Sequence, residues 1–148
     1  MSKVSDRIVF GSFEYVSLPQ FGIHDAVAKI DTGAYSGALH CSKVEVKEHS
    51  DGRKTLHFVP SNNKDCEIAT DQFEDVIVTS STGHKVGRYL ITTQITIQGK
   101  EYLITIGLAD RSNMQREILI GRRFLRENNI LVDTRIRQEL DNDGGEKV

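Results

Sequence analysis

Two short segments of the chain combine residue types that can do chemistry. Residues 28–34 read Ala-Lys-Ile-Asp-Thr-Gly-Ala, so an apolar-flanked strand ends in the carboxylate of Asp31, followed at once by Thr32 and Gly33. Residues 118–122 read Ile-Leu-Ile-Gly-Arg, an apolar run closed by a glycine. A carboxylate on such a turn can act as a general base, or it can serve only the turn itself. Asp-Thr-Gly alone is too short to decide between the two.

The elements that must position these segments are mostly β-strands. Apolar and polar residues alternate over 43–58 around the turn Ser50-Asp51-Gly52, and again over 91–108 around Gln98-Gly99-Lys100. This period of two predicts two hairpins, each with one buried face. The only helical signal is short and covers 122–128, with Phe124 and Leu125 facing inward.

The order of these segments is similar to that of the retropepsin-type aspartic peptidases. Residues 78–89 lie where those enzymes carry their flap hairpin. This stretch falls between the Asp31 segment (28–34) and the segment 118–122, in the same order as in those enzymes. The chain resembles the bacterial RimB-like family more closely, a family often labelled as ATP-dependent zinc proteases. The segments that carry this resemblance are 13–19, 28–40, 87–89, 109–114 and 118–133. It implies an all-β, retropepsin-like (acid protease) closed β-barrel with one lobe per chain and one short C-terminal helix.

The resemblance also implies a function, that of an aspartic-type endopeptidase. Asp31 would be catalytic, Thr32 would brace the loop across a dimer axis, and Gly33 would donate an N–H toward the carboxylates. Two carboxylates about 3 Å apart share one proton, so one can activate water while the other binds the scissile carbonyl. Asp-Thr-Gly occurs once, and Asp133-Thr134-Arg135 lacks the glycine. A peptidase of this kind must therefore be a homodimer, and its monomer should be inert.

The implied substrate is a peptide or protein tail. The RimB-like resemblance suggests a link to the ATP-grasp ligase RimK, which adds glutamate residues to a ribosomal protein, and so suggests glutamate-rich tails. Guanidinium groups bind carboxylates in bidentate geometry, which favours arginines as substrate ligands, although most arginines are simply solvated. The residues expected to bind substrate are Ala34, Thr82, Gly83, Arg88, Arg111 and Arg122.

Three departures from the family pattern affect these expectations. Tyr35 stands near the position where viral retropepsins place an acidic partner for the arginine after the apolar-Gly motif, so the partner of Arg122 is open. The expected flap tip, 80–84, lacks the repeated glycines of viral flaps. Ala34 offers no hydroxyl to the carboxylate, which favours activity nearer neutral pH.

Two other classes of function stay open. The chain could be a non-catalytic, retropepsin-like dimeric module that binds peptide by adding a strand to its sheet. It could also be a plain β-barrel with a coincidental Asp-Thr-Gly. Retained peptide binding without cleavage would favour the non-catalytic module. A protein that is monomeric at micromolar concentration would favour the plain β-barrel.

Composition narrows the remaining classes. With 148 residues, 38% of them hydrophobic and 27% charged, the chain predicts a single domain over 1–137 and a disordered polar tail over 138–148. A net charge of −2 argues against direct nucleic-acid binding. No stretch approaches the roughly 18 apolar residues of a membrane helix. We expect a cytoplasmic protein whose partners are itself and its substrate.

Metal and cofactor chemistry are not expected. The sequence contains neither a His-Glu-x-x-His helix nor a Gly-rich phosphate loop ending in Gly-Lys-Ser/Thr. Cys41 and Cys66 are too few for a disulfide scaffold, so both are expected to be reduced core thiols, and His40 is expected at the surface. Loss of activity on chelation would revive a metal site.

Overall fold

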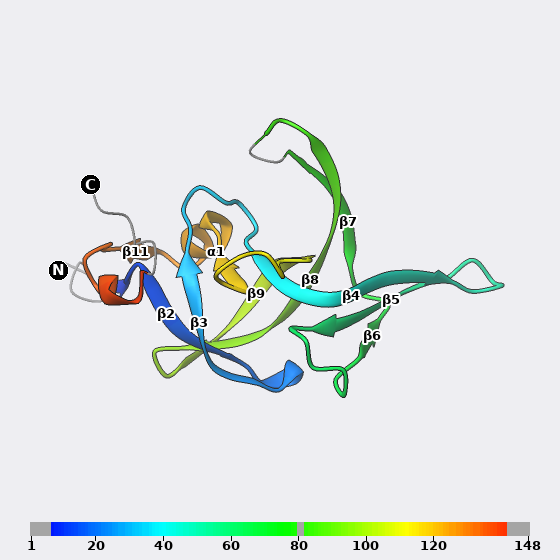
Figure 1. Cartoon of the computed structure of the whole chain (residues 1–148), viewed down its shortest axis with the longest axis horizontal. Coiled ribbons are helices and arrows are strands. Elements are labelled where there is room, and N and C mark those ends of the chain that lie inside the picture. The colour runs from blue at the N-terminus through cyan, green and yellow to red at the C-terminus, as the bar shows by residue number, and fades with distance from the viewer. Residues whose placement is uncertain (1–6, 80–81, 142–148) are drawn as a thin grey trace.

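The computed structural model describes residues 7–79 and 82–141, and it is mostly β with one α-helix (Figure 1). The prediction of a mostly β chain is confirmed. The elements are β1 (Ile8–Phe10), β2 (Phe13–Leu18), η2 (Pro19–Phe21), β3 (Ile23–Ile30), β4 (Ala38–Glu48), β5 (Lys54–Pro60), β6 (Ile68–Thr70), β7 (Glu74–Thr79), β8 (Lys85–Ile97), β9 (Lys100–Ala109), β10 (Ile118–Ile120), α1 (Arg122–Glu127), β11 (Ile130–Val132) and η3 (Gln138–Leu140).

Both predicted hairpins are present. β4 pairs antiparallel with β5, with Val46 opposite Leu56, and β8 pairs antiparallel with β9, with Ile91 opposite Ile106. The second hairpin turns at Gln98 and Gly99, which both have positive φ, 54° and 74°. This is the two-residue geometry whose twist matches that of the flanking strands.

The strands of the main sheet form a ring. Hydrogen-bonded neighbours run in the order β10, β3, β2, β8, β9 and β4, and β4 also pairs with β10. β10 lies parallel to β3, with Ile120 opposite Ile30, and antiparallel to the start of β4. The ring thus places the apolar run at 118–120 beside β3, the strand that leads into Asp31.

β7 lies outside this ring. It pairs only with the first half of β8, with Val78 opposite Val86, and the two strands form an arm that curves away from the other strands at the top of Figure 1. We call β7 and residues 82–90 the flap arm. Its base is held by an edge-to-face contact between Phe73 and Tyr89, whose ring centroids are 5.8 Å apart.

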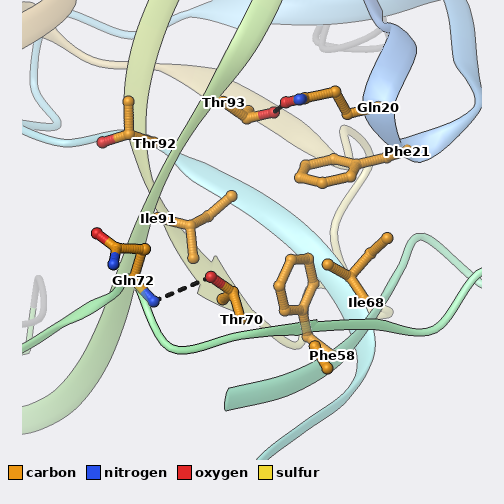
Figure 2. Close-up of a pocket in the computed structure, with 10 residues that line it drawn as sticks. Gln20, Phe21, Phe58, Ile68, Thr70, Gln72, Ile91, Thr92 and Thr93 are labelled. Atoms are coloured by element: carbon orange, nitrogen blue, oxygen red, sulfur yellow. Dashed lines mark hydrogen bonds between the residues drawn. The ribbon is translucent and has the colours of Figure 1, made fainter. Parts of the chain in front are cut away.

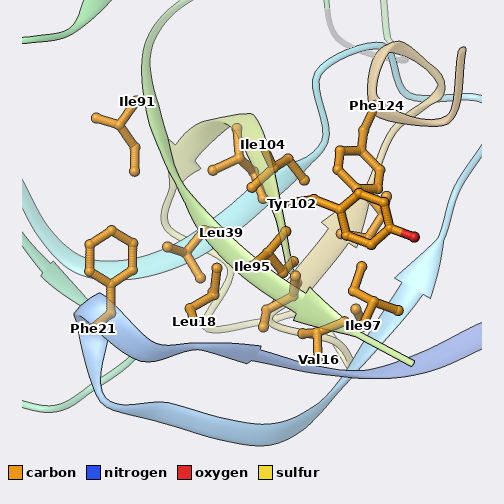
Figure 3. Packing of buried hydrophobic residues seen from close by; sticks show 14 of the residues in the cluster. Val16, Leu18, Phe21, Leu39, Ile91, Ile95, Ile97, Tyr102, Ile104 and Phe124 are labelled. Atoms are coloured by element: carbon orange, nitrogen blue, oxygen red, sulfur yellow. The ribbon is translucent and has the colours of Figure 1, made fainter. Parts of the chain in front are cut away.

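The core fills the ring with aliphatic side chains from β2, β4, β8 and β9 (Figure 3). At one end, the ring of Phe124 from α1 packs edge-on against Tyr102, with centroids 5.2 Å apart. Phe124 and Leu125 are both buried, so the predicted helix and its inward face are confirmed. Burial of the Cys41 side chain raises its pKa to about 12, so this thiol stays protonated at neutral pH.

The C-terminal segment is ordered beyond the boundary expected at residue 137. Arg137 forms an ion pair with the buried Glu14, and its Nε donates a 2.9 Å hydrogen bond to Phe13 O. The guanidinium of Arg116 then donates to Leu140 O at the end of η3. These polar contacts order residues 138–141, which composition alone predicted to be disordered. The rest of the expected tail, 142–148, lies outside the described residues.

Candidate functional site

The loop that follows β3, residues 31–37, carries the candidate carboxylate. The N–H of Asp31 donates to Ile120 O (2.8 Å), which fixes the start of the loop on β10. The N–H of Gly33 donates to Asp31 Oδ1 (3.0 Å), and the N–H of Ala34 donates to Asp31 O (3.1 Å). The carboxylate therefore lies half-exposed on a tight turn, with one oxygen held by the glycine N–H as expected.

Arg122, at the first position of α1, braces this loop. Its Nη1 donates to Thr32 O (3.3 Å) and to Gly33 O (3.0 Å), and its guanidinium lies 5.5 Å from the centre of the Tyr35 ring. The N–H of Arg122 also donates to Ala34 O (2.8 Å). The sequence left the partner of Arg122 open. In the structure, backbone carbonyls of the loop and the face of the Tyr35 ring take the place of an acidic side chain.

Two glycines permit the loop and β10 to approach this closely. Gly37 has φ +77°, and a Cβ there would collide with Leu119 O. A Cβ on Gly121 would collide with Tyr35 O and with the N of Gly37. Hence the glycine that closes the 118–122 segment is required by backbone contact with the loop.

Two grooves open beside the loop. The first, about 570 Å³, lies beneath the flap arm and is lined by Ala34, Val78, Val86, Arg88, Leu119 and Arg122 among others. The second, about 370 Å³, contains Asp31 itself together with Lys29, Arg111, Met114, Arg116 and Asp141. Leu119 borders both grooves. Both grooves are lined by cationic side chains, and the second also by the carboxylates of Asp31 and Asp141.

Arg88 reaches the first groove from the base of the flap arm. Its stem lies over Gly107, where a Cβ would sit 3.1 Å from Arg88 Cγ. Burial lowers the pKa of this guanidinium. Among the described residues its side chain makes no hydrogen bond or ion pair, so its donors are available to a ligand.

Arg111 lines the second groove together with Asp31. Its Nε donates to Arg116 O (3.0 Å), and its N–H donates to His40 Nδ1 (2.8 Å). Burial and the neighbouring charge of Arg88 lower the pKa of Arg111, while the Asp31 carboxylate acts in the other direction. The two arginines thus act electrostatically on one another across the site, and Asp31 acts on Arg111.

Thr82 and Gly83, two described residues of the expected flap tip, line neither groove. Both are exposed, with Gly83 at φ +87°. The flap-arm residues that line the first groove are Val78, Thr79, Val86, Arg88 and Leu90. Residues 80 and 81 of the expected tip lie outside the described part of the chain.

Three residues near the site were not found by sequence reasoning. Lys29 and Arg116 line the groove that holds Asp31. His40 was expected at the surface, but its side chain is only 1% exposed, so that prediction is wrong. The unbroken burial of residues 38–41 is the reason: the start of β4 lies between β9 and β10.

A further pocket of about 340 Å³ lies elsewhere in the molecule (Figure 2). The rings of Phe21 and Phe58 form its apolar floor, with centroids 5.5 Å apart, and Gln20 at its rim accepts a 2.6 Å hydrogen bond from Thr93 Oγ1.

Within 7–79 and 82–141, no group of three or more His, Cys, Asp or Glu side chains is placed to hold a metal ion. No helix in these ranges is long and apolar enough to cross a membrane.

The ring of strands and the braced loop define a mostly β protein with an aspartate-centred site between two cationic grooves. A family model described as RimB-like, "Retropepsin-like aspartic endopeptidase RimB", matches residues 9–140, and the chain belongs to this family. A coincidental Asp-Thr-Gly in an unrelated β-barrel is thereby excluded.

The chain is also similar to other proteins in sequence and in structure. The chain is 26% identical over 131 residues to a probable alpha-L-glutamate ligase of Parasynechococcus marenigrum, and 25% identical over 132 residues to one of Shewanella pealeana. These matches cover 86% of this chain but only 28% and 29% of the relatives. The crystal structure of Lpg0085, a protein of unknown function from Legionella pneumophila, superposes with a TM-score of 0.65 at 26% identity, covering 87% of this chain and 95% of the other.

Proposed function

We propose that this chain is an aspartic-type peptidase that works as a homodimer, with Asp31 of each chain forming one shared catalytic pair. The observation that carries the proposal is the half-exposed Asp31 carboxylate on a braced turn, held by the Gly33 N–H and bordered by two grooves. In such a pair the ionised carboxylate takes a proton from water, and the protonated one donates a hydrogen bond to the scissile carbonyl. The water oxygen then attacks the carbonyl carbon of the amide.

The dimer is part of this proposal because one chain supplies one Asp-Thr-Gly. Thr32 and Gly33 are exposed on the loop, and their side is open to a second copy of the same loop. An isologous contact about a two-fold axis would bring the two carboxylates together. On this proposal, the ring of strands is one lobe of a retropepsin-like barrel, and the monomer is inactive.

The substrate we propose is an acidic peptide segment, with glutamate-rich tails as the leading case. Arg88 and Arg111 approach from opposite grooves, and their terminal nitrogens make no hydrogen bond with a described residue. An unpaired, partly desolvated guanidinium gains most from a carboxylate partner. The glutamate ligase name of the relatives supports a glutamate substrate, but the ligase activity itself is not transferred, since this chain spans under a third of their length.

The test is cleavage of a glutamate-tailed peptide and a matched glutamine-tailed peptide, read by mass spectrometry, with the oligomeric state measured by sedimentation. We expect wild type to cleave the acidic peptide as a dimer, and Asp31→Asn to lose at least about a hundredfold in rate, the usual contribution of a general base. Asp133→Asn is the matched control, because Asp133 also precedes a threonine but pairs with Arg135. It should cleave like wild type.

Three results would count against the proposal. Equal cleavage by wild type and Asp31→Asn would remove Asp31 from the chemistry. Binding of the acidic peptide without cleavage by wild type would favour a non-catalytic peptide-binding module. Loss of activity with a chelator would point to a metal centre.

A further inference from the structure

His40 is a buried histidine that the proposed chemistry does not use. Its side chain is 1% exposed, and both ring nitrogens have partners. Nδ1 accepts the N–H of Arg111 (2.8 Å), and Nε2 lies 3.1 Å from Asn62 Oδ1. Because a backbone N–H can only donate, Nδ1 carries no proton, and Nε2 carries the proton that Asn62 accepts. The surroundings thus select one neutral tautomer.

This contact fixes the start of the loop that forms one wall of the Asp31 groove. The loop leaves β9 at Asp110, whose Oδ1 accepts the N–H of Ser112 (3.0 Å), and the N–H of Met114 donates to Arg111 O (2.9 Å). Arg111 is therefore held at its main-chain N–H by His40 and at its Nε by Arg116 O. With Arg111 held at these two atoms, its guanidinium lines the groove that also contains Asp31.

We propose that His40 is a positioning residue for the substrate site: its Nδ1 sets where Arg111 presents its guanidinium beside Asp31. The inference rests on the proposed function for its consequence, because Arg111 is there assigned to a substrate carboxylate. The Asp110 carboxylate does not provide the same restraint, because a neutral imidazole with an unprotonated Nδ1 forms no ion pair with it. Asp110 Oδ1 also lies 3.8 Å from Nδ1, and the Asp110 side chain is 76% exposed, where even an ion pair contributes little.

Two substitutions separate the positioning role from simple burial. In His40→Asn, the side-chain Oδ1 replaces Nδ1 as acceptor for Arg111, and the contact with Asn62 is lost. In His40→Gln, the side-chain Nε2 can still reach Asn62, but the acceptor for Arg111 is lost. Both variants bury a neutral amide of similar size, so a merely structural role predicts similar effects of both.

The experiment measures hydrogen exchange of the Arg111 amide and binding of a labelled hexaglutamate peptide. We expect His40→Asn to keep both near the wild-type values. We expect the Arg111 amide of His40→Gln to exchange about fivefold faster, the effect of losing one hydrogen bond of about 1 kcal/mol, and this variant to bind hexaglutamate several-fold more weakly. Equal behaviour of the two variants overturns the proposal.

Two further outcomes keep this test separate from that of the proposed function. If wild type binds no hexaglutamate, the acidic substrate class is wrong, while the exchange difference still decides whether His40 positions Arg111. If neither variant folds, the imidazole nitrogens of the wild-type protein decide by NMR. A protonated Nε2 and an unprotonated Nδ1 support the proposal, and a protonated Nδ1 overturns it.

Discussion

The loop at residues 31–37 and the flap arm border the same groove, but they are held in different ways. The loop is bonded to β10 and α1 through backbone groups, including Asp31 to Ile120 O and Arg122 to Ala34 O. The arm is built on the pairing of β7 with β8, and Ile77 on its surface is 71% exposed. The loop carries the carboxylate, and the arm lines the groove on which the same loop also borders.

This difference suits the proposed reaction. A general base loses much of its effect when its position changes by a fraction of an ångström, so a loop held by main-chain bonds is an advantage. On the proposed function, a substrate would also occupy the groove that the arm lines, and an arm with few contacts can adjust to it. We therefore expect substitutions in the loop to affect stability and those in the arm to affect binding.

The largest contrast is expected between Gly37→Ala and Gly83→Ala. Both glycines have positive φ, +77° and +87°, so both variants pay the strain of a left-handed residue, about 1 kcal/mol. Only at Gly37 does the added Cβ also collide with Leu119 O, whereas nothing lies within 4 Å at Gly83. We expect about 3 kcal/mol or more of lost unfolding free energy for Gly37→Ala and about 1 kcal/mol for Gly83→Ala.

Urea unfolding followed by circular dichroism measures this contrast. Equal losses in the two variants would mean that the contact between the loop and β10 is not what requires glycine at position 37.

A smaller contrast is expected between Arg122→Lys and Arg88→Lys. The guanidinium of Arg122 bonds two loop carbonyls, and a lysine cannot reproduce this arrangement, so we expect a loss of about 1 kcal/mol in stability. Arg88 has no bonded partner among the described residues, so Arg88→Lys should leave stability within about 0.5 kcal/mol. Its effect should instead be a higher KM for acidic peptides.

Thermal unfolding and steady-state kinetics on the two variants check this prediction. A stability loss in Arg88→Lys as large as that in Arg122→Lys would show that the flap arginine is structural, contrary to its assignment to substrate.

The sequence predicted those parts of the fold and the site that depend on the alternation of apolar and polar residues. Alternation of apolar and polar residues located both hairpins. The sequence did not reveal the partners of Arg122, because these are backbone carbonyl groups, which every residue has and which no residue type marks. Nor did it find the burial of His40, because alternation assumes a strand with one exposed face, and the start of β4 has none. The ordered residues 138–141 depend on Arg116 and Arg137, which are close only in space.

The smallest effect we expect comes from giving the loop a hydroxyl donor at position 34. Ala34 N–H bonds Asp31 O, so its side chain belongs to the same turn as the carboxylate. In Ala34→Thr, a hydroxyl that donates to the carboxylate stabilises its charged form, so the catalytic pair should lose its first proton at lower pH. One hydrogen bond of about 0.5–1.5 kcal/mol corresponds to roughly half to one pH unit. The acid limb of the pH–rate profile should move down by that amount, whereas Ala34→Val, of similar shape without the hydroxyl, should not move it. A shift of the acid limb in both variants would mean that bulk in the groove, and not the hydrogen bond, controls the pH dependence.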